Sequence, residues 1–148
     1  MNRREALVRG VGAAAFAIGA RALGAASEVG TKTGPLASAN SNQRLIDAAY
    51  LCQKEGELCL QHCDTLLAAK DNTLAECARA VREMLVACRA ISSLAAQQSG
   101  HLKEMAVLCG KICRECEAEC QKHASHHEIC RQCGESCKAC ASECDKVA

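Results

Sequence analysis

The chain has 148 residues, a formal net charge of +1, one tyrosine, one phenylalanine and no tryptophan. This length suits a single domain, the near-neutral charge indicates neither a nucleic-acid nor a membrane-surface partner, and the scarcity of aromatic side chains leaves no surface on which bases could stack. Fourteen cysteines in a chain of this size indicate a disulfide scaffold or a metal-binding protein.

The first segment, residues 1–26, resembles a twin-arginine (Tat) export signal. Arg3 and Arg4 precede a run rich in glycine and alanine, which ends in small residues before Ser27. Arg21 interrupts this run, whereas a membrane span needs roughly 20 apolar residues. We therefore expect export to the periplasm without a membrane anchor, and a cytosolic protein if the signal is not functional.

The remainder of the chain divides into a linker and a helical domain. Residues 27–42 are rich in Gly, Ser, Thr and Asn and contain the only proline. From Gln43 onward helix formers dominate, and the alternation that marks strands is absent. The sequence predicts a domain over 43–148 with helices at about 43–70, 74–98, 101–123 and 126–146.

Each predicted break between helices carries a local signal. Thr73 and Ser125 each stand three residues before a glutamate, the pattern of a capping box. Asp71-Asn72 is a turn pair, and Ser99-Gly100 ends the second helix. Because all three connections are short, consecutive helices should be antiparallel neighbours. The expected fold is all-α, an up-down-up-down antiparallel four-helix bundle.

Cysteines occupy one face of every predicted helix. Residues at i, i+4, i+7 and i+11 share a helix face, and the cysteines follow this spacing. Cysteine buries less surface than leucine, so packing alone does not explain so many of them. The expected cysteine-lined core comprises Cys52, Cys59, Cys63, Cys77, Cys88, Cys109, Cys113, Cys116, Cys120, Cys130, Cys133, Cys137, Cys140 and Cys144.

The spacing of these cysteines favours a soft metal ion. The pattern C-x-x-x-C recurs five times, and thiolates at i and i+4 can hold one ion between them. Zinc sites usually draw four ligands from C-x-x-C pairs on loops, and iron–sulfur sites use other motifs. A continuous line of thiols suits Cu(I), which accepts two or three ligands. An iron–sulfur or zinc-binding redox or detoxification protein, or an exported disulfide scaffold, remains an alternative.

Methionine and histidine add candidate ligands. Met84 lies on the cysteine stripe of the second predicted helix, where it could instead be core filler. His123 and His126 lie on the stripes where the third helix ends and the fourth begins, and they suggest a mouth for metal; surface capping is the alternative. His127 points away from the stripe and His62 lies at a stripe edge, so both are weaker candidates.

Several segments together resemble the bacterial copper storage proteins (the Csp family), in particular their Tat-exported branch. They are C-L-Q-H-C (59–63), E-C-A-R-A-V-R-E-M-L-V-A-C-R-A (76–90), C-R-E-C-E-A-E-C-Q-K-H-A-S-H-H-E-I-C (113–130) and the five-cysteine final helix. The resemblance implies a four-helix bundle whose inward thiolates bind many Cu(I) ions, often within a homotetramer. It also implies that all fourteen cysteines are Cu(I) ligands, with Met and His contributing at a mouth.

The expected function is a Cu(I) store, not an enzyme, because the sequence offers no catalytic triad, phosphate-binding loop or carboxylate dyad. Its capacity should be on the order of one Cu(I) per cysteine if each thiolate bridges two ions. A copper-requiring enzyme or a copper chaperone is the expected recipient.

Overall fold

The computed structural model describes residues 40–148. The predicted export signal and the linker up to residue 39 lie outside the described residues. Within residues 40–148 the chain forms four helices and no strand: α1 (Gln43–Ala68), α2 (Ala75–Ala96), α3 (Leu102–Gln121) and α4 (Glu128–Asp145). The four predicted helices are confirmed, and each predicted end differs from the observed one by at most two residues.

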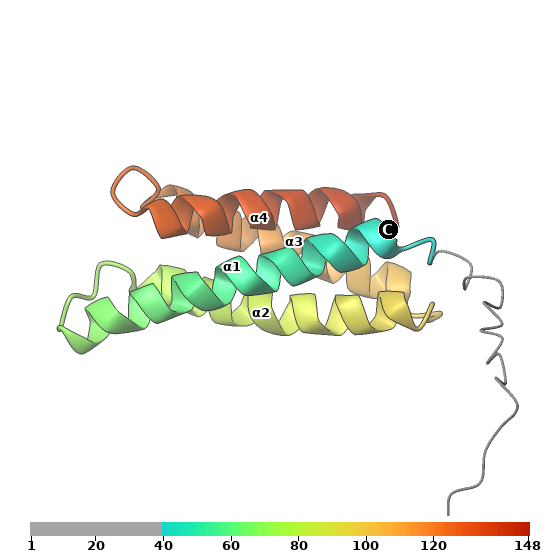
Figure 1. Ribbon diagram of the computed structural model, residues 1–148, viewed down its shortest axis with the longest axis horizontal. Helices are drawn as coiled ribbons and strands as arrows, with labels where there is room; N and C mark the ends of the chain where they lie inside the picture. Colours follow the sequence, from blue (N-terminus) through green and yellow to red (C-terminus); the bar gives the residue numbers. More distant parts are fainter. Residues whose placement is uncertain (1–39) are drawn as a thin grey trace, which may run out of the picture. The chain divides into compact units, whose positions relative to one another are not determined.

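The four helices pack as an up-down-up-down bundle. α1 contacts α2 and α4, and α3 contacts the same two helices. Figure 1 shows the α1–α2 and α3–α4 connections at one end of the bundle, and the α2–α3 connection at the other. The predicted all-α bundle is therefore confirmed. None of its helices combines the length and the apolar character that crossing a membrane requires.

The core of the bundle has two chemically different parts. All fourteen cysteines point inward and are fully buried. The start of α1, the end of α2 and the start of α3 meet at the end with the α2–α3 connection, and there the core is aliphatic. We call this group the apolar plug: Leu45, Ile46, Ile91, Ala95 and Leu102. It closes one end of the column of sulfur atoms.

The two predicted capping boxes are wrong. α2 begins after Leu74 and α4 after His127, and neither start has a side-chain capping hydrogen bond. The backbone N–H of Thr73 instead donates to Asp71 Oδ1 at 3.0 Å, which forms a turn before the helix. Glu128 pairs with Arg131 one turn along α4. The box residues therefore lie too early in the chain to cap these helices.

α1 and α2 are each followed by a residue other than glycine in a left-handed backbone conformation, which the sequence did not predict. Lys70 and Gln98 adopt left-handed backbone conformations, with φ of 65° and 51°. At the end of α2 the amide of Ser99 donates a hydrogen bond of 3.0 Å to the carbonyl of Leu94, which the helix itself leaves without a donor. This position usually holds glycine, but Gly100 follows two residues later.

Candidate metal centre

All fourteen cysteines are free thiols with 0% exposure. They reach the core because each helix directs every third or fourth residue inward, and those residues include two or more cysteines on every helix. The polar faces of the same helices carry ion pairs such as Arg79–Glu83 at 2.8 Å. The helical pattern thus gathers the sulfur atoms into one column.

Sulfur atoms from different helices lie close together. Cys77 and Cys120 are 3.7 Å apart, and so are Cys88 and Cys113. Cys59 and Cys130 are 4.0 Å apart. A disulfide bond requires about 2.05 Å between sulfurs, so these pairs are thiols in contact. Such distances allow one soft ion to sit between two or three of them.

Thirteen of the fourteen thiols, all except Cys130, form five groups; within each group the sulfur atoms lie within 4.8 Å of one another. Cys59, Cys133 and Cys140 each belong to two groups, so the groups overlap along the bundle. An ion in one group could therefore share a ligand with an ion in the next. The groups are Cys59–Cys63–Cys77, Cys59–Cys120–Cys133, Cys116–Cys133–Cys137, Cys52–Cys88–Cys113–Cys140 and Cys109–Cys140–Cys144.

One group takes a single cysteine from each helix. It contains four thiols, which is the number that a tetrahedral zinc site needs. The other four groups offer three thiols each, which suits an ion of lower coordination number. Because Cys140 also belongs to a three-thiol group, even the four-thiol site is not isolated from its neighbours.

The thiols also perturb one another's protonation. Hydrogen bonds from Cys59 and Cys77 lower the pKa of Cys63 to about 3 and that of Cys130 to about 3. Hydrogen bonds with Cys120 and Cys130 raise the pKa of Cys59. Some thiols of the cluster thus favour the thiolate while their neighbours keep the proton. Since a metal binds thiolates, the cluster contains ready ligands, and each further ion displaces protons.

Met84 lies among the thiols, as its place on the stripe predicted. Its Sδ atom is 3.3 Å from Cys52 Sγ, and its side chain is fully buried. Gly56 of α1 makes room for it, because a Cβ atom at Gly56 would lie 2.5 Å from the Met84 methyl group. A thioether is a soft ligand that binds without losing a proton. Met84 is therefore available to an ion held by Cys52.

The histidines gather at the end with the α3–α4 connection, but in a different set from the one predicted. His62 Nε2 and His127 Nδ1 are 2.9 Å apart, and the rings of His123 and His127 are 6.5 Å apart. All three are half-buried, whereas His126 is exposed. The charges of His127 and His123 lower the pKa of Cys130, after the larger effect of its hydrogen bonds with Cys59 and Cys77.

The structure therefore brings His123 to the sulfur column but leaves His126 outside it. The prediction extended α4 back to residue 126 and projected both neighbouring histidines on a helical wheel. α4 in fact begins at Glu128, and His127 has an extended backbone. The angular argument does not apply to a residue outside the helix. The third histidine of this set, His62, stands beside Cys63 in the C-x-x-H-C segment of α1, and this segment is the sequence pattern that places it near the thiols.

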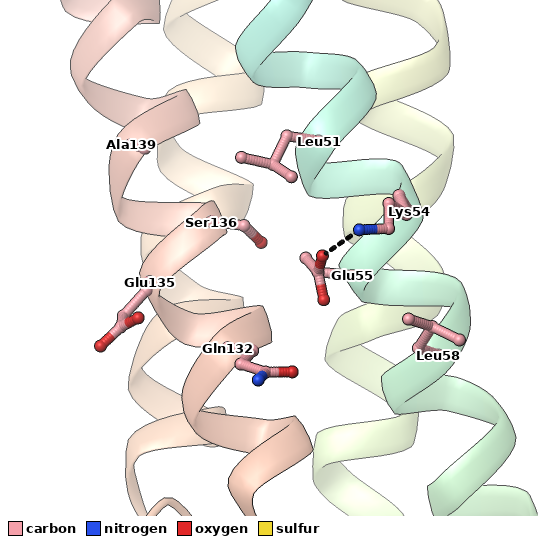
Figure 2. A pocket seen from close by; sticks show the side chains of 8 residues that line it. All are labelled: Leu51, Lys54, Glu55, Leu58, Gln132, Glu135, Ser136 and Ala139. Atoms are coloured by element: carbon pink, nitrogen blue, oxygen red, sulfur yellow. Dashed lines mark ion pairs between the residues drawn. The ribbon is translucent and has the colours of Figure 1, made fainter.

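A surface groove between α1 and α4 is separate from this centre (Figure 2). Lys54 and Glu55 form an ion pair of 3.0 Å along its wall. None of the side chains that line it contains sulfur, so the groove does not extend the metal centre. The lining residues are Leu51, Lys54, Glu55, Leu58, Gln132, Glu135, Ser136 and Ala139.

Comparison with known families gives one match that spans most of the chain. The profile of the Csp family, described as copper storage protein, matches residues 38–148. No curated protein sequence matches the chain. The family match therefore covers all four helices and all fourteen cysteines.

Several solved structures are similar to the bundle. The Cu(I)-bound copper storage protein BsCsp3 is 31% identical, with a TM-score of 0.66 over 72% of this chain and 97% of that one. The apo form of Csp3 from Bacillus subtilis is 30% identical, with a TM-score of 0.64 over 72% and 98%. A cytosolic copper storage protein from Streptomyces lividans, described with five coppers, is 25% identical, with a TM-score of 0.66 over 72% and 90%.

Proposed function

Since this chain belongs to the copper storage protein family, we propose that it stores Cu(I) on the thiolates of its fourteen buried cysteines. The observation that carries the proposal is the overlap of the thiol groups: shared cysteines link three of the five groups to one another and the other two to each other. A thiolate that bridges two ions allows the number of ions to approach the number of cysteines. The Cu(I)-bound state described for the relative BsCsp3 supports the same conclusion.

The chemistry of the cluster favours Cu(I) over other metals. Soft thiolate and thioether ligands select Cu(I), and four of the five groups offer only three thiols. In residues 40–148 no histidine, aspartate or glutamate belongs to these groups, so harder ions find no oxygen ligand there. The proposed role is storage and not catalysis, which the family assignment supports.

We propose that copper enters between His62, His123 and His127. These residues lie at the end of the bundle opposite the apolar plug, and the charges of His123 and His127 act on Cys130. A neutral imidazole is a good ligand for copper and can pass an ion to a neighbouring thiolate. His126, which is exposed, remains a predicted ligand without a contact in this set.

An anaerobic titration tests the storage proposal. The fully reduced protein is titrated with Cu(I) in the presence of bicinchoninate, which is coloured when it binds Cu(I). We expect the protein to withhold on the order of one ion per cysteine before the colour develops. If the protein withholds only one or two ions, it is not a copper store.

Zinc is the alternative that a specific observation favours, because one group has four thiols, one from each helix. A parallel titration with Zn(II) and a zinc indicator separates the two functions. A zinc protein would bind Zn(II) at this group and withhold no more Cu(I) than Zn(II). A copper store would bind many more Cu(I) ions than Zn(II) ions.

The cellular setting is also a proposal. We propose that residues 1–26 direct export by the Tat route, because a twin arginine precedes the Gly/Ala-rich run. The Streptomyces relative is described as cytosolic, so the signal would set this chain apart from it. The mass of protein recovered from the periplasm tests this, since a processed chain would start at Ser27.

Assembly and delivery complete the proposal. Tyr50, Leu51 and Leu58 of α1 are 58%, 47% and 43% exposed, and large exposed side chains on one helix support contact with another protein. We propose that a copper-requiring enzyme or a chaperone receives the metal. We also propose that the bundles form a homotetramer. Light scattering on the reduced protein would show the assembly as a fourfold mass.

A further inference from the structure

The column of thiols is divided into two compartments. The outer compartment lies toward the histidines and contains eight cysteines: Cys59, Cys63, Cys77, Cys116, Cys120, Cys130, Cys133 and Cys137. The inner compartment lies toward the apolar plug and contains six: Cys52, Cys88, Cys109, Cys113, Cys140 and Cys144. In the described bundle, none of the five metal-binding groups takes members from both compartments.

Contact between the compartments passes through Cys52. Its sulfur is 3.7 Å from that of Cys137 in the outer compartment. The same atom is 3.3 Å from Met84 Sδ. Cys52 Sγ therefore contacts the sulfur atoms of both Cys137 and Met84 where the two compartments meet.

The sequence explains why the column is thin at this level. α1 places Gly56 between Cys52 and Cys59, and α2 places Met84 and Val81 between Cys88 and Cys77. Between these cysteines, in what we call the middle layer, the two helices therefore contribute no thiol. The Met84 methyl group occupies the space that a side chain at Gly56 would fill. The Met84 sulfur is the one soft atom that α1 and α2 offer there within the described bundle.

Within the described bundle, the contact of Cys52 with Cys137 is the one sulfur–sulfur contact of 4.0 Å or less between the inner and outer compartments. The apolar plug covers it on the far side, and Leu45 and Ile91 are 2% and 0% exposed. The inner thiols are themselves fully buried along the sides of the bundle. An ion that enters between the histidines must therefore cross the middle layer to reach them.

We infer that Met84, Cys52 and Cys137 form a three-sulfur transfer site that passes Cu(I) from the outer to the inner compartment. This inference rests on the proposed function. The thioether is neutral, so it holds Cu(I) less strongly than a thiolate does and releases it to the next thiolate. The transfer is an exchange of ligands, and copper remains Cu(I) throughout.

Stopped-flow loading of the reduced full chain from the Cu(I)–bicinchoninate complex tests the transfer site. We expect two phases in the wild-type protein: fast filling of the outer compartment and slow filling of the inner one. Met84→Leu keeps the volume of the side chain and removes its sulfur, so the fold is retained. The variant should slow the second phase by about tenfold or more and leave the first phase and the final stoichiometry unchanged.

Met105→Leu is the matched control, because Met105 packs against the core near the start of α3 and belongs to neither compartment. It should load like the wild type. Cys137→Ser removes the other side of the transfer site and should also slow the second phase. Loading in a single phase, or a second phase that Met84→Leu leaves unchanged at full capacity, would overturn the transfer site and leave storage intact. Failure to bind more than one or two ions would instead overturn the proposed function.

Discussion

A cysteine side chain carries less apolar surface than leucine, yet cysteine is the most frequent buried residue of this bundle. Each buried thiol therefore contributes less to the stability of the empty protein than a larger aliphatic residue would. In return, every sulfur faces other sulfurs from a neighbouring helix or turn, as in the 3.8 Å contact of Cys88 with Cys140. Individual residues of this core thus combine a modest packing role with the proposed role as ligands.

The double change Cys140→Ser and Cys144→Ser tests this combination at the inner end. Two of the three thiols of the Cys109–Cys140–Cys144 group are lost, so the Cu(I) capacity should fall by about two ions. The empty protein should remain folded, because a helical serine can donate to a carbonyl one turn back, as Ser136 does to Cys133 at 2.8 Å. Copper titration measures the first effect and circular dichroism the second.

Ala141→Ser is the control for that experiment. Ala141 is buried on α4 between the two cysteines, so the control adds a hydroxyl without removing a sulfur. Its capacity should equal that of the wild type. An unchanged capacity in the double variant would show that these thiols do not hold copper.

The inward placement of all fourteen cysteines could be predicted from their spacing alone, because a regular helix fixes which residues share a face. The same reasoning does not extend to the histidines beside α4. His126 and His127 lie beyond the regular helix, where the backbone angles, and not the position in the sequence, decide the direction of a side chain. The 2.9 Å pair of His62 and His127 also joins residues that are distant in the chain.

The number and order of the helices could be predicted from the sequence, but the way in which each helix begins and ends could not. A strong helical pattern extends through each element, but capping depends on the backbone conformation of a few residues. Asp71 binds the amide of Thr73 in a turn, so Thr73 does not begin α2. The sequence permits both a capping box at Thr73 and a turn closed by Asp71, and it does not show which of the two forms.

The left-handed residue after α2 provides a test at this scale. Gln98 is exposed and has φ of 51°, a conformation that side chains other than that of glycine adopt at a cost. Gln98→Gly should raise the free energy of unfolding of the empty, reduced protein by about 0.5–1 kcal/mol, since the greater freedom of the unfolded chain offsets part of the gain. Urea unfolding measures the change.

Gln97→Gly is the neighbouring control. Gln97 is also exposed, but its φ is −84°, so glycine relieves no strain there. This variant should be no more stable than the wild type. If both glycine variants behaved alike, the left-handed conformation of Gln98 would not be the source of the effect.

For the molecule as a whole, the proposed function couples metal loading to stability. The core sulfurs come from all four helices, so an ion held by several of them connects helices that otherwise meet through small side chains. The unfolded chain has no assembled site, and binding to the folded state therefore adds to the free energy of unfolding. With free Cu(I) buffered about a thousandfold above Kd, one site should add about 4 kcal/mol.

Unfolding in urea, with and without Cu(I), measures this gain under anaerobic conditions. The midpoint should rise as copper is added and stop rising when the capacity is reached. The Cys140→Ser and Cys144→Ser variant should gain less than the wild type. A loaded protein with the midpoint of the empty one would contradict binding within the folded core.

The apolar plug has a consequence for the order in which stored ions return. Under the proposed function, a bundle closed by Leu45, Ile91 and Leu102 at one end would be loaded and emptied through the same opening. Under the proposed function, the ions deposited last lie nearest that opening and leave first. The deepest copper would then be a long-lived reserve, released only after the outer sites are empty.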